Sequence, residues 1–195
     1  MTTKQQRLSP RERLLAAAGD LFYKQGYRAT GVNEVIAKAG VAKATFYAHF
    51  PSKDDLCLAY LKDRNTREAT EILDFVRTKR TPRTRFLAVI ESMEPWAIHT
   101  DFRGCQFINM VPEVPDVESP LREEGHRHYD WARKQVRELA GELIESDKKS
   151  YGHLDIDELT NAYMTHLAGA VALAGVYNEL WPIRDGIAAV QRLVG

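Results

Sequence analysis

The sequence predicts an all-α protein, with an N-terminal three-helix helix-turn-helix domain at residues 1–53 and a C-terminal helical domain at residues 54–195. Two observations favour this fold class. Apolar residues recur three and four positions apart along most of the chain, which is the spacing of one face of an α-helix. No two segments alternate apolar and polar residues in the manner of paired strands, so a β-sheet is not expected.

The first helix is expected to begin at Ser9-Pro10, since serine caps helices and proline suits the first helical position. Glu12 stands where it can complete a capping box with the serine. Gly26 is placed to end the helix. The apolar residues between these ends fall on one helical face: Leu14, Leu15, Ala18, Leu21 and Phe22.

Two shorter helices are expected to follow. Thr30 can cap a helix at about residues 31–39, which Gly40 then breaks. A third helix is expected at about residues 43–50, ending at Pro51. The residues of the second helix expected to face inward are Val32, Val35 and Ile36. Three helices with a glycine turn between the second and third are typical of a helix-turn-helix.

The third helix is expected to hold two phenylalanines inward and to turn two alanines outward. At about 100° per residue, Phe46 and Phe50 share one face, and Ala44 and Ala48 share the opposite face. A helix that enters the major groove of DNA needs a face small enough for its backbone to approach the bases. The flanking residues can hydrogen-bond phosphates: Lys43 and Tyr47 on one side, Thr45 and His49 on the other.

The rest of the chain is expected to be helical as well. Ser52 and Asp55 form a second capping pair, which starts a long helix reaching about Val76. Prolines at positions 95, 112, 115 and 120 predict an irregular middle region. Further helices are expected at about residues 82–93, 121–145, 155–179 and 182–194, with the segment KKSYGHLD at 148–155 as a loop.

Charge is divided unevenly along this neutral chain. Residues 1–53 hold nine Lys/Arg and three Asp/Glu, a net charge of +6, which the remaining residues balance. A basic head on an acidic body predicts that the head alone contacts a polyanion such as DNA. Only two cysteines, Cys57 and Cys105, and an N-terminal stretch without an apolar signal core predict a cytoplasmic location.

Membrane and metal-dependent functions are less consistent with the residues. The stretch at 159–178 is uncharged and long enough to span a bilayer, but its small and polar residues favour a buried helix, so no membrane contact is expected. Glu124/His128 and His126/Asp130 have a spacing that can bind metal. No HExxH, CxxC, GxSxG or P-loop motif accompanies them, so no metal, cofactor or catalytic residue is expected.

The segment at residues 26–56 (GYRATGVNEVIAKAGVAKATFYAHFPSKDDL) closely resembles the DNA-binding head of the TetR family of bacterial transcriptional regulators. The elements that carry the resemblance are Gly26-Tyr27, Thr30, Val35-Ile36-Ala37, Ala39-Gly40-Val41, Thr45, Tyr47, His49-Phe50 and Ser52-Lys53. It implies a ligand-responsive repressor that acts as a homodimer on a palindromic double-stranded DNA operator. The residues at the family's DNA-contacting positions are Thr30, Asn33, Lys43, Ala44, Thr45, Tyr47, His49 and Lys53.

Three residues depart from the family pattern. Ala42 stands where a serine often caps the recognition helix, so a weak cap is expected, at a cost of about 1 kcal/mol. Gly31 replaces the usual threonine or serine after Thr30. Ala48 stands where many members carry a larger side chain. The head is therefore expected to depend on backbone contacts, thymine methyls and DNA shape.

The resemblance also implies a small-molecule effector pocket and a dimer interface in the C-terminal domain. Such pockets are largely apolar with a few polar anchors, although for any single candidate ordinary core packing is the competing interpretation. The candidates are Phe86, Met93, Trp96, Cys105, Phe107, Met110, Trp131, Tyr163, His166 and Tyr177. The residues expected to form the dimer interface, as part of a four-helix bundle between two subunits, are Met164, Ala168, Val171, Ala172, Gly175, Ile187, Val190 and Val194. The alternative is that they pack within one subunit.

One further segment, at residues 103–109 (RGCQFIN), looks like the RGC-x-x-x-N segment of one TetR subgroup. Some members with Gly-Cys at this place sense electrophiles through that cysteine. A small buried hydrophobe is the simpler interpretation of Cys105, because a reactive thiol requires a lowered pKa.

The residues alone leave other functions open. A helical protein-interaction module explains the helical body but leaves the basic head unused. A repressor is the expected function, and the sequence does not exclude an activator.

Overall fold

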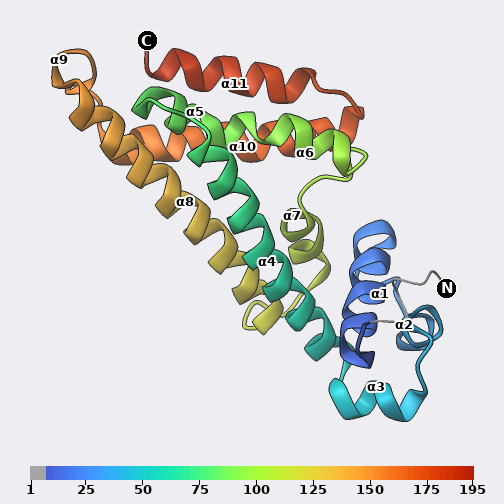
Figure 1. The fold of residues 1–195 in the computed structure, drawn as a ribbon. Coiled ribbons are helices and arrows are strands. Elements are labelled where there is room, and N and C mark those ends of the chain that lie inside the picture. Colours follow the sequence, from blue (N-terminus) through green and yellow to red (C-terminus); the bar gives the residue numbers. More distant parts are fainter. Residues whose placement is uncertain (1–7) are drawn as a thin grey trace. The chain divides into compact units, whose positions relative to one another are not determined.

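The computed structural model describes residues 8–195, which form helices joined by turns and loops, with no strand in that range (Figure 1). The predicted all-α fold class is therefore confirmed. Lys4 and Arg7, which contribute to the charge of the predicted head, lie outside the described residues. Among the helices of residues 8–195, none combines the length and the apolar character that crossing a bilayer requires.

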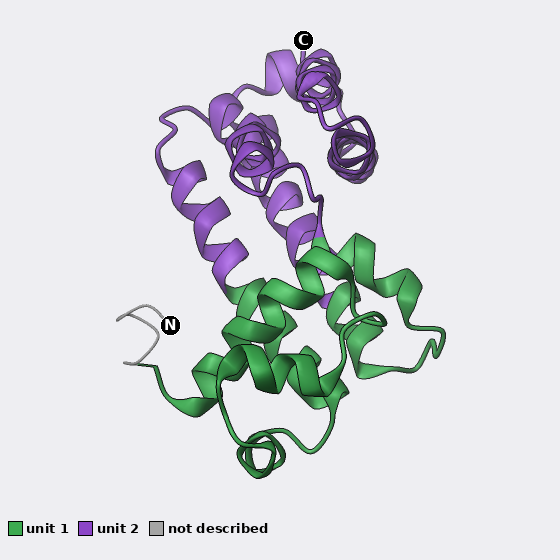
Figure 2. Cartoon of the chain, turned by 90° about the vertical axis from the view of Figure 1, so that its right-hand side faces the viewer, with its two compact units in different colours: residues 1–66, 106–126 green, residues 67–105, 127–195 purple. Residues whose placement is uncertain are grey.

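The chain divides into two compact units (Figure 2). Unit 1 comprises residues 1–66 and 106–126, and unit 2 comprises residues 67–105 and 127–195. Unit 1 thus joins the predicted helix-turn-helix head to a segment from the middle of the sequence. The functional boundary after residue 53 stays a prediction.

Unit 1 contains the three predicted head helices. Its elements are α1 (Pro10–Gln25), α2 (Val32–Ala39), α3 (Lys43–His49), the first part of α4 (Lys53–Arg77), α7 (Gln106–Met110), the 3-10 helix η2 (Val111–Glu113) and the start of α8 (Pro120–Ser146). The capping box of α1 forms as predicted. The Ser9 hydroxyl accepts the backbone N–H of Glu12 at 3.3 Å, and the Glu12 carboxylate accepts the backbone N–H of Ser9 at 2.7 Å.

The predicted cap of α2 is wrong. Gly31 occupies the N-cap position, and no side chain caps the helix. Thr30 is instead buried, with 1% of its surface exposed. Its hydroxyl donates to the carbonyl of Gly26 at 2.7 Å and accepts the side-chain amide of Gln25 at 3.3 Å. Thr30 therefore closes the turn after α1 and does not start α2.

Unit 2 is a bundle of longer helices. It contains the remainder of α4 and α8, together with α5 (Pro82–Glu91), α6 (Met93–His99), α9 (Lys148–Tyr151), α10 (Ile156–Tyr177) and α11 (Trp181–Leu193). The segment at 148–155 is not entirely a loop, because it begins with the single turn of α9. Asp147 caps that turn by accepting the N–H groups of Lys149 and Ser150, both at 3.1 Å.

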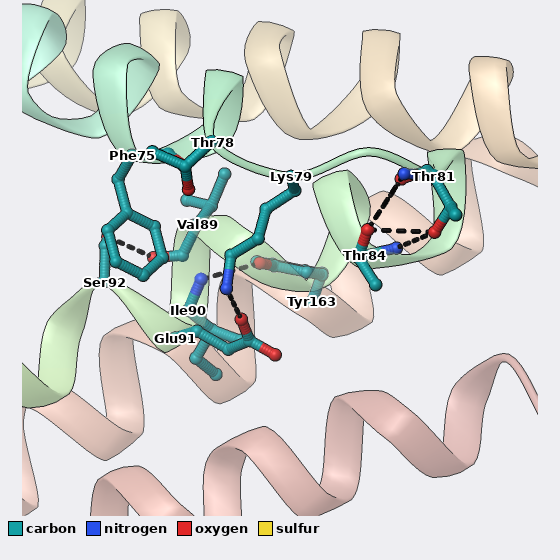
Figure 3. A network of polar contacts seen from close by, with 10 residues as sticks. All are labelled: Phe75, Thr78, Lys79, Thr81, Thr84, Val89, Ile90, Glu91, Ser92 and Tyr163. Carbon is teal, nitrogen blue, oxygen red and sulfur yellow. Dashed lines mark hydrogen bonds and ion pairs between the residues drawn. The ribbon is translucent and has the colours of Figure 1, made fainter.

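Two contacts organise unit 2. The hydroxyl of the buried Tyr163 on α10 accepts the backbone N–H of Ile90 on α5 at 2.8 Å (Figure 3). Its ring meets Phe86 edge-on, with centroids 5.0 Å apart. At the crossing of α10 and α11, a Cβ atom added to Gly186 would lie only 2.8 Å from the Cβ of Ala170. Glycine therefore permits this close approach.

Candidate nucleic-acid interface and ligand cavity

Two phenylalanines attach α3 to unit 1. Phe46 is fully buried and Phe50 is 3% exposed, with their ring centroids 6.4 Å apart. The guanidinium of Arg11 on α1 lies 5.4 Å from the Phe50 ring centroid, within cation–π range. The predicted inward face of α3 is confirmed.

A glycine makes the sharp turn between α2 and α3 possible. Gly40 adopts a left-handed conformation, with φ 62°, which other residues adopt only with strain. Its N–H donates to the last turn of α2, and its carbonyl accepts the Arg13 guanidinium of α1 at 3.2 Å. The turn is thereby fixed from both sides, and it sets the direction in which α3 leaves α2.

The opposite face of α3 is exposed to solvent. Tyr47 is 48% exposed, and its ring meets Phe46 edge-on at 5.1 Å between centroids. The other exposed residues of the helix are Lys43, Ala44, Ala48 and His49, and Thr45 is half-buried. Ala42 provides no side-chain cap, as the sequence predicts. The helix thus presents two methyl groups flanked by hydrogen-bonding side chains and no carboxylate.

The remaining predicted DNA-contacting residues have different surroundings. Asn33 is exposed on α2. Lys53 is half-buried, and its ammonium donates to the carbonyls of Tyr27 at 3.1 Å and Thr30 at 3.3 Å. The same ammonium lies 4.2 Å from the Tyr27 ring centroid. Lys53 and the buried Thr30 therefore hold the loop before α2 in place.

Comparison with known proteins places this head in a family. The profile described as "Bacterial regulatory proteins, tetR family" matches residues 14–60, which include all of α2 and α3. A TetR transcriptional regulator of Streptomyces avermitilis has a solved structure that is 30% identical, with a TM-score of 0.79. That match covers 95% of this chain and 98% of the other. The chain belongs to the TetR family. It is therefore a DNA-binding transcriptional regulator.

Two curated relatives agree with this assignment. The HTH-type transcriptional regulator LmrA of Bacillus subtilis is 30% identical over 125 residues, which are 63% of this chain and 66% of LmrA. The HTH-type transcriptional repressor NemR of Escherichia coli is 23% identical over 189 residues, which are 94% of this chain and 93% of NemR. TetR-family regulators bind DNA operators and form dimers.

Unit 2 contains a cavity of about 180 Å³ that is partly open to solvent. Helices α4, α5, α6, α8 and α10 contribute to its wall, which is mostly apolar and includes Phe75, Met93, Trp96 and Leu167. The polar residues of the wall are Glu68, Glu71, Ser92, Cys105, His128 and Tyr129. The cavity therefore has the mostly apolar wall with a few polar groups that is typical of small-molecule sites.

The structure places three of the ten predicted pocket residues in this wall, namely Met93, Trp96 and Cys105. The other seven lie elsewhere: Phe86, Phe107, Met110, Trp131, Tyr163, His166 and Tyr177. Phe86 and Tyr163 form the core of unit 2, as described above. Met110 belongs to unit 1, where its sulfur lies 3.5 Å from the Cys57 thiol. Tyr177 is 53% exposed and packs on Trp181.

A buried carboxylate and an imidazole lie in the wall. Glu68 and His128 are 8% and 7% exposed, and their nearest oxygen and nitrogen are 3.9 Å apart. Glu68 is not evident from the sequence, because α4 is strongly charged along its length and one inward-facing carboxylate does not stand out. A spacing of three and four residues, from Glu68 to Ile72 and Phe75, is the signal that could have placed it on the inner face.

Cys105 and Tyr129 form a second polar pair in the wall. The Tyr129 hydroxyl lies 3.6 Å from the Cys105 sulfur. Burial raises the pKa of Tyr129 well above its usual value, and the adjacent Cys105 adds to that shift. The phenol is therefore a neutral hydrogen-bond donor at physiological pH. Ser92 uses its hydroxyl differently, donating to the Val89 carbonyl at 2.7 Å.

Of the eight residues of the predicted dimer stripe on α10 and α11, three are buried, three are half-buried and two, Ala172 and Gly175, are exposed. Val171, Val190 and Val194 are buried, and Val171 and Ala168 line the cavity. A Cβ atom added to Gly175 would lie 3.1 Å from the Phe102 carbonyl. Met164 and Ile187 are half-buried, whereas Ala172 is exposed. The exposed residues in the second half of α10 overlap the predicted stripe at Ala172 and Gly175. They also include Thr165, Gly169, Leu173 and Val176, each about one residue away from a stripe position.

The two residue pairs considered for metal binding have other surroundings. Glu124 is buried and accepts the side-chain amide of Asn65 at 3.1 Å. His126 and Asp130 are both exposed. Within residues 8–195, no group of three or more His, Cys, Asp or Glu side chains is arranged to hold a metal ion.

Proposed function

We propose that the chain is a ligand-responsive repressor that acts as a homodimer on a palindromic operator in the cytoplasm. The observation that carries the proposal is the orientation of α3, which two buried phenylalanines hold so that Ala44, Tyr47 and Ala48 face solvent. Repression is proposed because the similarity to NemR, which is named a repressor, spans 94% of this chain, whereas the similarity to FasR of Mycolicibacterium smegmatis, which is named an activator, spans 50%.

In the proposed complex, α3 of each subunit lies in the major groove. The alanine face contacts base edges and thymine methyls, and Lys43, Tyr47 and His49 bind phosphates. One helix of this length contacts few bases. Two copies about 34–36 Å apart can contact successive major grooves, which explains why a dimer and a palindrome are needed.

The exposed face of α10 is the proposed dimer interface. Val176 is 75% exposed and Leu173 is 44% exposed, which is unusual for large apolar residues on one helix. Gly169 lies between them and the start of the helix, and a Cβ atom added there would meet nothing within 4 Å. Tyr177 and Trp181 extend this apolar surface toward α11. A second copy of the same face would remove these side chains from water.

We propose that the segment at 106–126 links the cavity to the head. It follows Cys105 and precedes His128, both of which line the cavity in unit 2. The segment itself belongs to unit 1, where the Glu113 carboxylate accepts the backbone N–H of Arg28 at 2.7 Å. A ligand that favours one arrangement of the cavity wall can therefore change the population of head positions that fit the operator.

We further propose that the chain belongs to the subgroup with the RGC-x-x-x-N segment and that Cys105 has a packing role there. Its burial and its contact with the Tyr129 hydroxyl support this interpretation. Slow alkylation of the native protein by iodoacetamide is expected, with Cys105→Ser as the control. Rapid alkylation at Cys105 that abolishes operator binding would contradict a packing role.

The proposed function is tested with the DNA upstream of the protein's own gene. Fluorescence anisotropy with the full chain is expected to show sequence-specific binding that weakens steeply with salt, because Lys and Arg displace counterions from phosphates. Scrambled DNA of the same length is the control. Equal binding to both DNAs, or none to either, contradicts the proposal.

The link through residue 113 is tested separately with Glu113→Gln. The variant is expected to bind operator within about three-fold of the unaltered protein but to lose part of its response to effector, because an amide accepts the Arg28 N–H less strongly than a carboxylate. An unchanged effector response contradicts a role for this contact in coupling.

A further inference from the structure

We propose that the cavity of unit 2 binds a small protonated aromatic amine, with the ring against the apolar wall and the ammonium at Glu68. The inference rests on the proposed function, because this molecule would be the effector. It names a chemical class that follows from the size, the lining and the charge of the cavity.

The volume limits the ligand to one ring system. A cavity of roughly 150 Å³ lined by apolar side chains accommodates benzene, and this cavity measures about 180 Å³. A single or fused ring with a short side chain fits that space.

The apolar wall favours an aromatic ring. Phe75 on α4 and Trp96 on α6 contribute aromatic surface, and Met93 adds a polarizable thioether. Aromatic rings gain from edge-on and offset contacts with such side chains, and sulfur also packs favourably against them. A cationic nitrogen near the same rings gains a cation–π contribution.

The charge of the wall selects an amine over a carboxylic acid. Glu68 is 92% removed from solvent, and Glu71 lies in the same wall with its side chain exposed. No lysine or arginine occurs among the described residues that line the cavity. A ligand carboxylate would therefore be desolvated beside like charges, whereas an ammonium would be paired.

Glu68 can accept the ammonium in addition to its present partners. A carboxylate has about four acceptor sites, so it can accept more than one donor at a time. The nearest atoms of Glu68 and His128 are 3.9 Å apart, which is too long for a hydrogen bond between those two atoms. A primary ammonium has three donors, so it can meet the carboxylate and a neighbouring acceptor together.

Three probes of similar shape test the proposal by calorimetry on the full chain: 2-phenylethylamine, propylbenzene and 3-phenylpropanoate. The amine is expected to bind at least ten-fold more tightly than the carboxylate, since only the amine complements Glu68. The proposal is overturned if the carboxylate binds as tightly as the amine, or if the amine fails to bind at millimolar concentration.

The Glu68→Gln variant tests whether Glu68 is the residue that binds the ammonium. This variant is expected to bind 2-phenylethylamine about ten-fold or more weakly than the unaltered protein, while its affinity for propylbenzene changes by less than three-fold. Asp74→Asn is the matched control, because Asp74 is an exposed carboxylate on the same helix that pairs with Arg77 and does not line the cavity. An equal loss in both variants overturns the assignment to Glu68. If Glu68→Gln does not fold, the relative affinities of the three probes for the unaltered protein still decide whether the cavity prefers an amine.

A second readout separates this proposal from the proposed function. Operator binding is measured by anisotropy in the same samples, with and without 2-phenylethylamine. Operator binding without any amine binding refutes the effector class and leaves the regulator intact. Amine binding to a protein that recognises no upstream DNA refutes the proposed function, while the site in the cavity remains.

Discussion

The head and unit 2 use their apolar residues in different ways. In the head, each of the helices α1, α2 and α3 buries a narrow stripe of apolar residues. The opposite face of each helix carries polar or small residues and contacts water. The position of the stripe in the sequence therefore shows which face of the helix points inward. In unit 2, α10 is apolar on nearly every side, and its faces meet the core, the cavity and solvent in turn. The comparison teaches that an amphipathic helix defines its own orientation, whereas a uniformly apolar helix takes its orientation from its neighbours.

The largest expected effect in this comparison is the loss of the anchor of α3. Phe46→Ala removes a fully buried ring and is expected to cost about 3–5 kcal/mol in the free energy of unfolding, measured with urea. Tyr47→Ala on the same helix is the control, because that ring is 48% exposed. If the two variants lose the same stability, the assigned inward face of α3 is wrong.

The two glycines of α10 and α11 separate packing inside unit 2 from packing between subunits. Gly186→Val is expected to lower the free energy of unfolding by about 1–3 kcal/mol, because its side chain would overlap Ala170. At Gly169, an added Cβ atom would meet nothing within 4 Å, so Gly169→Val is expected to fit within its own subunit. It is therefore expected to weaken the dimer in light-scattering measurements while the subunit remains folded. A stable dimer of Gly169→Val would contradict the proposed interface.

A substitution of Lys53 tests how the loop before α2 is held in unit 1. Lys53→Met removes two charge-assisted hydrogen bonds to the Tyr27 and Thr30 carbonyls, and it is expected to cost about 1–2 kcal/mol in the free energy of unfolding. Binding to all DNA sequences is expected to fall by a similar factor. A change in base preference, measured by competition between operator variants, would instead assign Lys53 to base recognition.

Much of the head can be predicted from the sequence because local signals specify it. Ser9 with Glu12 and the left-handed Gly40 fix helix ends through contacts a few residues apart. Thr30 is the exception, since the same residue can cap a helix or close the preceding turn. In unit 2 the helices were predictable, but the faces were not. The small residues of α10 match a dimer stripe in two registers, and the sequence alone does not show which residues pack against α11 or line the cavity. The register of the dimer interface stays a prediction.

The smallest expected effect concerns one hydroxyl on the outer face of α3. Tyr47→Phe is expected to weaken operator binding about two-fold to ten-fold, because one phosphate contact is lost. Binding to scrambled DNA is expected to weaken by a similar factor. Thermal unfolding should be unchanged, because the ring remains packed against Phe46. A selective loss on operator alone would show that the hydroxyl contributes to base recognition.

The central claim is that the alanine face of α3 enters the groove, and Ala48→Glu tests it most directly. A carboxylate at this exposed position would enter the negatively charged groove, so operator affinity measured by anisotropy is expected to fall at least ten-fold without a change in melting temperature. Ala16→Glu, the same substitution at an exposed position of α1, is expected to bind within three-fold of the unaltered protein. Equal affinities of the two variants would contradict the claim.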